Sequence, residues 1–309
     1  MPRHFLRDDD VTPAEQREIL ELALAFAAQR YLEQPLLGPK AVAFITDKPT
    51  LRTQASFAIG IAELGGYPFM FDGNLAQIGK RESISDTTKV LTRMVSAIVW
   101  RTSADSRIEE MAANSTVPVI NALTDGFHPC QVLADLTTIA QQRGGVRGLS
   151  GLVFTYLGDG ANNMAHSYLL GGATAGMHVQ IACPPGYQPN PEILAKAADI
   201  AAETGGSVAV IEDPRQAVAG ADVVATDTWV SMGDEAEAAA RATPFLPYRL
   251  DSGLLAAANR DAIVLHCLPA YRGSEITADV IDGPQSFVFP EAENRLHAQK
   301  ALLTWLLTR

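Results

Sequence analysis

The stretch Ala262-Ile263-Val264-Leu265-His266-Cys267-Leu268-Pro269 joins an apolar run to a polar turn that ends in proline. An apolar run without polar alternation is typical of a strand buried on both faces, as in a parallel sheet. In open α/β sheets, ligands bind outside the carboxyl ends of the strands. The tetrapeptide at 266–269 is therefore predicted to lie at a binding site.

Short apolar segments of this kind recur along the chain, separated by helical lengths. Strands are predicted at 41–45, 67–71, 97–100, 117–121, 152–157, 179–183, 208–211, 223–226 and 263–267. The capping box Thr12-Pro13-Ala14-Glu15, with proline at the first helical position, predicts a helix that runs to about Tyr31. This alternation predicts an α/β fold with mostly parallel sheets and helices on both faces.

The strands form two series, and a glycine-rich stretch separates them. Gly144-Gly145-Val146-Arg147-Gly148 follows the polar residues 141–143 and is the best domain boundary in the sequence. We therefore predict two doubly wound parallel-sheet domains, at 1–143 and 144–285. The segment 291–307 has leucines at helical spacing and predicts a long final helix.

Composition limits the class of protein. The chain has 309 residues, 47% apolar and 19% charged, which is typical of two folded domains with substantial cores. No apolar run approaches the roughly 18 residues of a membrane span, and no signal peptide opens the sequence. Three cysteines do not suggest a disulfide framework, and the formal charge of −11 argues weakly against a nucleic acid partner. We expect a cytoplasmic protein that binds neither membrane nor nucleic acid.

Cationic and hydroxyl groups follow two of the predicted strands. The loop Lys48-Pro49-Thr50-Leu51-Arg52-Thr53-Gln54 lies between a strand and a helix, where hydroxyls, backbone amides and an arginine can hold a phosphate. An ordinary helix cap beside a surface arginine would have the same composition. Arg101 directly follows an apolar strand and needs an anionic partner if buried, either a bound phosphate or a protein carboxylate. The residues alone leave these alternatives open.

Two further motifs stand after predicted strands. Phe127-His128-Pro129-Cys130-Gln131 offers side chains that can contact a carbonyl or amide group, although a lone His-Pro pair is usually a turn. Gly158-Asp159-Gly160-Ala161-Asn162-Asn163 resembles a dinucleotide-binding turn, but Asn163 breaks the glycine pattern and no acidic residue ends the next strand. The two asparagines can instead grip a carboxylate or an amino group. The spacing of Cys130 and Cys183 offers no zinc pattern.

An ordered set of motifs carries a close resemblance to a known family. They are 128–131, Asp227-Thr228-Trp229-Val230-Ser231-Met232-Gly233, His266-Cys267-Leu268-Pro269 and Glu293-Asn294-Arg295. With them, the chain resembles the ornithine carbamoyltransferases over essentially its whole length. The resemblance implies a cytoplasmic enzyme of arginine biosynthesis that uses no metal or cofactor and forms a trimer or a multiple of trimers. It implies transfer of the carbamoyl group of carbamoyl phosphate to the δ-amine of L-ornithine, giving L-citrulline and phosphate.

The resemblance also implies roles for the domains and residues. A carbamoyl-phosphate-binding domain at 1–143 would be completed by a C-terminal helix at 286–309, and 144–285 would bind ornithine. The residues implied for carbamoyl phosphate are Thr50, Leu51, Arg52, Thr53, Gln77 from a neighbouring subunit, Arg101, His128, Gln131, Cys267, Leu268 and Arg295. Those implied for ornithine are Asn163, Asp227, Ser231, Met232, Cys267 and Leu268. The residues implied to be catalytic are Arg101, His128, Asp227, Cys267 and Arg295.

The chemistry agrees with these roles. Carbamoyl phosphate is already activated, so catalysis needs only a neutral amine held against its carbonyl carbon, and proximity is worth up to about 7–11 kcal/mol. Negative charge on the carbonyl oxygen and the leaving phosphate can be stabilised by Arg52, Arg101, His128 and Arg295. Cys267 by itself suggests a nucleophile, but this reaction needs none, and we interpret it as a polar wall of the site.

The sequence departs from the family at the substrate end. The family's phosphate loop usually reads Ser-Thr-Arg-Thr-Arg, whereas Leu51 here removes a hydroxyl and Gln54 removes a positive charge; Tyr271 stands where histidine is common. Three hypotheses follow. The chain is an active ornithine carbamoyltransferase with a modified loop, a paralogue that uses another amine or resists a substrate-mimicking inhibitor, or a non-catalytic relative retained for binding or assembly. The intact arginines and Asp227 favour an enzyme, and the segment 231–233 favours ornithine.

Overall fold

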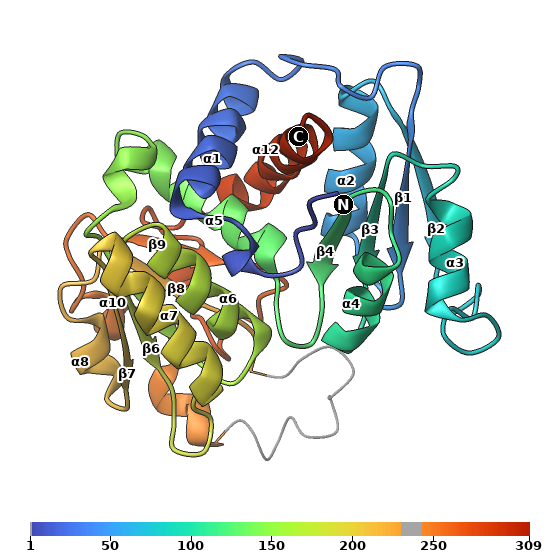
Figure 1. Ribbon diagram of the computed structural model, residues 1–309. Helices are drawn as coiled ribbons and strands as arrows, with labels where there is room; N and C mark the ends of the chain where they lie inside the picture. The colour runs from blue at the N-terminus through green and yellow to red at the C-terminus, as the bar shows by residue number, and fades with distance from the viewer. Residues whose placement is uncertain (1, 230–242) are drawn as a thin grey trace. The chain divides into compact units, whose positions relative to one another are not determined.

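The computed structural model describes residues 2–229 and 243–309, which fold into two units with one parallel sheet each (Figure 1). The first unit takes the residues up to Thr137 together with Glu293–Arg309, and the second takes Thr138–Ala292. Two helices contain the points of division, α5 (Pro129–Gln142) and α12 (Val288–Leu307). The end of α12 thus belongs with the N-terminal part of the chain.

The sheet of the first unit has the strand order β2-β1-β3-β4, with all pairs parallel. Its strands are β1 (Ala41–Thr46), β2 (Tyr67–Asp72), β3 (Ala97–Arg101) and β4 (Val119–Leu123). The other α-helices of the unit in the described residues are α1 (Pro13–Ala28), α2 (Arg52–Glu63), α3 (Ile84–Leu91) and α4 (Asp105–Ala113).

Both faces of this sheet are covered by helices. Phe44 of β1 packs against Phe57 of α2, with ring centroids 5.7 Å apart. Its neighbour Ile45 points to the opposite face and joins a buried cluster with residues of α3 and α4. Burial on both faces explains why β1, β3 and β4 are apolar without alternation, whereas β2, at the edge of the sheet, is largely exposed.

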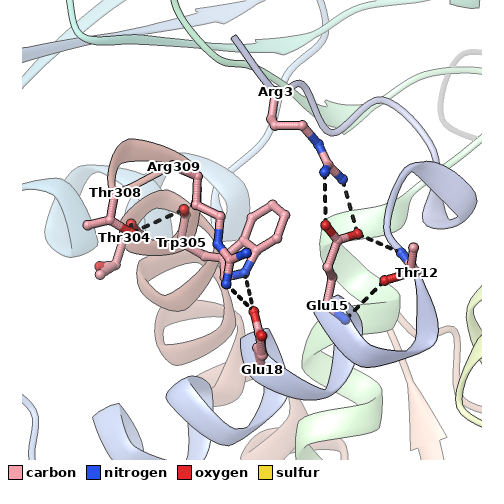
Figure 2. A network of polar contacts seen from close by, with 8 residues as sticks. All are labelled: Arg3, Thr12, Glu15, Glu18, Thr304, Trp305, Thr308 and Arg309. Atoms are coloured by element: carbon pink, nitrogen blue, oxygen red, sulfur yellow. Dashed lines mark hydrogen bonds and ion pairs between the residues drawn. The ribbon is translucent and has the colours of Figure 1, made fainter.

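Helix α1 begins at the capping box that the sequence predicts. The Thr12 hydroxyl accepts a hydrogen bond from Glu15 N at 3.3 Å, and the Glu15 carboxylate accepts one from Thr12 N at 2.9 Å. Arg3 donates to the same carboxylate at 2.8 Å (Figure 2), and this pair lowers the pKa of Glu15 to about 2. The N-terminal segment is therefore held on the first turn of α1.

The C-terminal end of α12 is held on α1 by a second part of this network (Figure 2). Trp305 Nε1 donates to Glu18 Oε2 at 3.0 Å, and Arg309 pairs with the same carboxylate. The guanidinium groups of Arg3 and Arg309 lie 5.3 and 4.9 Å from the Trp305 ring centroid. Both chain ends therefore contribute to one cluster.

A buried ion pair fixes α12 on α2. Lys300 is fully buried, and its Nζ donates to Glu63 Oε2 at 2.8 Å. Arg30 Nε donates to the other oxygen of Glu63 at 2.6 Å. A Cβ at Gly60 would lie 3.1 Å from the Lys300 side chain, so glycine leaves it room to pass. An ammonium group this deeply buried needs such a partner.

The sheet of the second unit has the order β7-β6-β5-β8-β9, again with all pairs parallel. Its strands are β5 (Val153–Leu157), β6 (His178–Ala182), β7 (Ser207–Ile211), β8 (Val223–Thr226) and β9 (Ile263–His266). Its helices include α6 (Asn163–Thr174), α7 (Pro191–Thr204), α8 (Pro214–Val218), α10 (Ser252–Leu255) and α11 (Ala278–Ile281). Tyr168 of α6 packs on Phe154 of β5 with ring centroids 4.6 Å apart. Val224 and Val264 join a core with α8, α10 and α11.

These observations confirm the predicted fold class, with two parallel sheets and a final helix that returns to the N-terminal part of the chain. All nine predicted strands are present, with small shifts at their ends. The fourth begins at Val119, because Pro118 has no N–H for the sheet. Helix α1 ends at Ala28, earlier than predicted.

Among the described residues, no helix combines the length and the hydrophobicity that a membrane span requires.

Candidate active site

The strand order of the first sheet reverses between β1 and β3, and this switch point is where ligands bind in such folds. The loop predicted to hold phosphate starts there and leads into α2, whose N-cap residue is Leu51. Leu51 is 77% exposed and forms no side-chain cap. The first turn of α2 therefore has backbone N–H groups without a side-chain cap, and a helix N-terminus of this kind attracts an anion.

Two arginines from distant parts of the sequence meet at the hydroxyl of Thr53. Arg101 Nη1 donates to Thr53 Oγ1 at 3.4 Å, and Arg295 Nη2 donates to the same oxygen at 2.8 Å. All three residues are buried, with exposures of 6%, 3% and 0% for Arg101, Arg295 and Thr53. Two guanidinium groups around one uncharged hydroxyl give a strongly electropositive site, which suits an anionic ligand.

His128, just before α5, is buried, and these arginines act electrostatically on its imidazole. Burial lowers the pKa of its imidazole well below the usual 6.5, and the positive charges of Arg295, Arg101 and Arg52 lower it further. The ring is therefore neutral at pH 7 and carries a single N–H. A neutral donor can polarise a carbonyl oxygen while the arginines balance the charge of a phosphate.

The two glutamines predicted for this site lie in different surroundings. Gln131 is fully buried, and its Nε2 donates to Asp135 Oδ1 at 2.8 Å, which fixes its amide plane. Gln77 is exposed in the loop after β2 and has a left-handed φ of 56°. Gln77 thus lies on the surface of the chain.

In the second sheet the order reverses between β5 and β8, and Asp227 directly follows β8. Asp227 Oδ1 accepts hydrogen bonds from Thr228 N at 2.7 Å and Cys267 Sγ at 3.1 Å. Burial raises the pKa of the Asp227 carboxyl, and both hydrogen bonds to it oppose this rise. Because the two bonds go to Oδ1, the second oxygen can bind a cationic group.

His266 holds the turn that carries Cys267. Leu268 N donates to His266 Nδ1 at 2.9 Å, so the ring proton is on Nε2, which lies 3.1 Å from Glu275 Oε1. The backbone N–H of His266 donates to Glu291 Oε2 at 2.8 Å. A histidine engaged on both ring nitrogens is not placed to deprotonate Cys267, so the geometry argues against a cysteine nucleophile. No spacing or motif in the sequence marks Glu275 and Glu291 as supports of this turn.

Asparagines begin α6 at the end of β5. Asn163 is its first residue, and the preceding Asn162 caps it by accepting from Ala165 N at 2.8 Å. Asn162 Nδ2 donates to the hydroxyl of Tyr156 at 2.8 Å. Burial raises the pKa of Tyr156 well above 10, so this phenol stays neutral. Of the predicted ornithine residues, Ser231 and Met232 lie outside the described residues.

The structure shows the contacts of two positions, Gln54 and Tyr271, at which this sequence differs from the family pattern. Gln54 lies in the first turn of α2 and lines a cavity shared with Lys48, whose ammonium is 2.7 Å from Asp125 Oδ1. Tyr271 is 57% exposed and uses its backbone N–H to donate to Glu275 Oε1 at 2.6 Å. The loop departure thus changes the charge beside the loop predicted to hold phosphate, whereas the Tyr271 side chain lies largely in solvent.

Comparison with protein families matches both units. Residues 3–141 match the carbamoyl-P binding domain of the aspartate/ornithine carbamoyltransferases, and residues 150–306 match the Asp/Orn binding domain of that family.

Individual relatives agree with this match. The ornithine carbamoyltransferase of Renibacterium salmoninarum is 61% identical over 313 residues, covering 100% of both chains. That of Bifidobacterium longum subsp. infantis is 60% identical over 304 residues, covering 98% of this chain and 95% of the relative. Among solved structures, the ornithine carbamoyltransferase from Pyrococcus furiosus has a TM-score of 0.94 at 43% identity, covering 99% of this chain and 97% of that one. The anabolic ornithine carbamoyltransferase from Campylobacter jejuni has a TM-score of 0.92 at 35% identity, covering 98% of each chain.

Proposed function

The chain belongs to the aspartate/ornithine carbamoyltransferase family, and from this premise we propose that it carbamoylates the δ-amine of L-ornithine, giving L-citrulline and phosphate. The observation that carries this proposal is the convergence of Arg101 and Arg295 on Thr53, in the unit that matches the carbamoyl-P binding domain. This cluster is suited to a dianionic phosphate.

The first unit is proposed to bind carbamoyl phosphate. Backbone N–H groups at 50–53 and the side chains of Arg52, Arg101 and Arg295 would hold the phosphate. The neutral ring of His128 would donate to the carbonyl oxygen, and Gln131 would contact the carbamoyl amide. These groups stabilise the charge that develops on the carbonyl oxygen and the leaving phosphate.

The second unit is proposed to bind ornithine. The Asp227 carboxylate would hold a substrate ammonium group, assisted by Asn163, Ser231 and Met232, while Cys267 and Leu268 form a wall of the site. The neutral δ-amine attacks the carbamoyl carbon, so a C–N bond forms and the bond to the phosphate oxygen breaks. Its electron pair leaves with phosphate, and the amine proton is lost to phosphate or solvent.

We propose a homotrimer, or a multiple of trimers, in which Gln77 completes a neighbouring subunit's site. Strand β2 is an edge strand, and its Tyr67, Phe69 and Met70 are 57%, 42% and 37% exposed. An edge with exposed apolar side chains is normally covered by another chain. The exposed Gln77 loop follows this strand directly, which supports a role for Gln77 at a subunit contact.

We also propose a cytoplasmic enzyme of arginine biosynthesis. None of its three cysteines forms a disulfide within the described residues, and Cys130 and Cys183 are buried. Burial raises the pKa of these two thiols to about 12 and about 11, so both stay protonated and unreactive. A reducing compartment suits this set of thiols.

Restoring the family's loop is expected to tighten carbamoyl phosphate binding. Leu51→Thr and Gln54→Arg together should lower the apparent KM for carbamoyl phosphate by about tenfold, because a hydrogen bond to a charged group contributes about 1.5–3 kcal/mol. The KM for ornithine should change less than twofold. Initial rates with each substrate varied in turn measure both constants, and an unchanged KM for carbamoyl phosphate would mean that the departures are neutral.

Cys267→Ser is expected to keep measurable turnover. The serine hydroxyl can donate to Asp227 Oδ1 as the thiol does, so the carboxylate stays oriented. Steady-state citrulline formation checks this expectation. Turnover that disappears in a folded variant would point to a covalent role for the thiol.

A panel of amines tests the proposed acceptor. The purified protein should use L-ornithine in preference to putrescine, L-lysine, L-aspartate and Nα-acetyl-L-ornithine, because Asp227 suits a free ammonium group beside the reacting amine. Product formation from carbamoyl phosphate with each amine can be measured by mass spectrometry. A higher kcat/KM with any other amine would replace ornithine as the assigned substrate.

A further inference from the structure

Arg107 of α4 contacts three segments at the carboxyl end of the first sheet, where the phosphate loop begins. Its Nη2 lies 3.3 Å from Asp47 Oδ2 and donates to Ile78 O at 3.1 Å, while its Nε donates to Thr102 Oγ1 at 2.9 Å. The guanidinium lies 5.0 Å from the ring centroid of Trp100. A planar group with donors in several directions is thus held by contacts to three segments.

Asp47 is the point at which this arginine reaches the phosphate loop. Asp47 directly follows β1, and its N–H donates to Arg101 O at 2.9 Å. Its Oδ2 accepts from Thr102 Oγ1 at 2.6 Å as well as from Arg107. The Asp47 side chain is only 10% exposed, so its position sets where the chain enters residues 48–53.

The same arginine reaches the loop that presents Gln77. Its acceptor is the backbone oxygen of Ile78, the residue after Gln77. Gln77 itself has a left-handed φ, which is unfavourable for residues other than glycine. A Cβ at Gly79 would lie 3.0 Å from Arg107 Nη1, so glycine lets the loop approach the guanidinium. Asn74 Nδ2 also donates to Asp47 O at 2.6 Å. Arg107 and Asp47 therefore hold the Gln77 loop and the start of the phosphate loop together, around a cavity of about 170 Å³.

We propose that Arg107 is a positioning residue that, through Asp47, fixes both the subunit's own phosphate loop and the Gln77 loop of a neighbouring site. This inference rests on the proposed trimer and on the proposed role of Gln77. It makes adjacent sites depend on one guanidinium, because a shift of Arg107 displaces groups in two active sites at once.

Kinetics of the homomeric variants test the positioning role. Arg107→Met should raise the KM for carbamoyl phosphate and lower kcat, with a total loss in kcat/KM of about 10- to 100-fold, the size expected from a displacement of about 1 Å at the reacting groups. The KM for ornithine should stay within about twofold, because Asp227 lies in the other unit.

Arg107→Lys keeps the charge but not the planar set of donors, and should recover only part of the loss. Arg17→Met, on the exposed side of α1, is the matched control. Constants of Arg107→Met within twofold of the parent would overturn the proposal.

Mixed trimers test the link between sites. Arg52→Ala disables a subunit's own site but keeps its Gln77, so Arg52→Ala subunits should restore activity to Gln77→Ala subunits in mixed trimers. Failure of this rescue would refute the assigned role of Gln77. It would leave the proposed function intact, because that function is measured separately on the parent enzyme. Mixed with Arg52→Ala, Arg107→Met should recover only part of its lost activity, because the partner supplies an intact Gln77 loop but cannot repair the phosphate loop. Full recovery or no recovery would each contradict the dual role.

Discussion

Arg101→Met is expected to lower kcat/KM for carbamoyl phosphate by about 100- to 1,000-fold, the usual cost of removing one donor that stabilises charge in a transition state. Arg101 is 6% exposed and shares the Thr53 hydroxyl with Arg295, so solvent cannot easily replace its charge. Methionine fills much of the arginine stem without the guanidinium. Initial rates with carbamoyl phosphate varied at saturating ornithine measure the effect.

The control for this variant is Arg17→Met, which removes a guanidinium from the exposed side of α1. It should leave both kinetic constants within about twofold, as expected of a surface substitution. If kcat/KM for carbamoyl phosphate falls by less than about tenfold in folded Arg101→Met, Arg101 does not contact the phosphate, because a charge-stabilising donor contributes more than that.

Asp227→Asn is expected to lower kcat/KM for ornithine by about 30-fold or more, because losing one partner of a buried charge pair costs about 2–5 kcal/mol. Asparagine keeps an oxygen for Thr228 N, so the main change is the lost charge. The KM for carbamoyl phosphate should change little. Asp199→Asn, on the exposed face of α7, is the matched control. Equal effects on both substrates would contradict a role specific to ornithine.

The pH dependence of the parent enzyme provides a further check on Asp227. Burial raises the pKa of this carboxyl, so protonation begins at a higher pH than for an ordinary aspartate. Ornithine affinity should therefore fall as the pH drops through this raised pKa, since the neutral acid no longer attracts an ammonium group. Asp227→Asn should remove that acidic limb from the profile of KM for ornithine. An unchanged limb would assign it to another group.

Much of the fold could be predicted because local signals agree with it. Thr12 and Glu15 form the predicted capping box, and each buried strand is an apolar segment of suitable length. Strand ends were less predictable, as Pro118 shows, because hydrogen bonding decides the final residue.

The site was predicted less completely, because its supports come from distant segments. Arg295 reaches Thr53 across 242 positions of the sequence, and only the family resemblance linked the two. The contacts of His266 with Glu275 and Glu291, and of Arg107 with the Gln77 loop, have no spacing that marks them. Such residues can be found only once the chain is folded.

Carbamoylation of ornithine is tested by measuring citrulline formation by the purified protein at millimolar carbamoyl phosphate and L-ornithine, with Arg101→Met and Asp227→Asn measured alongside. We expect steady turnover with release of one phosphate per citrulline. Each variant should lose activity strongly, Arg101→Met through carbamoyl phosphate and Asp227→Asn through ornithine. Absence of citrulline from the folded parent protein would contradict this function.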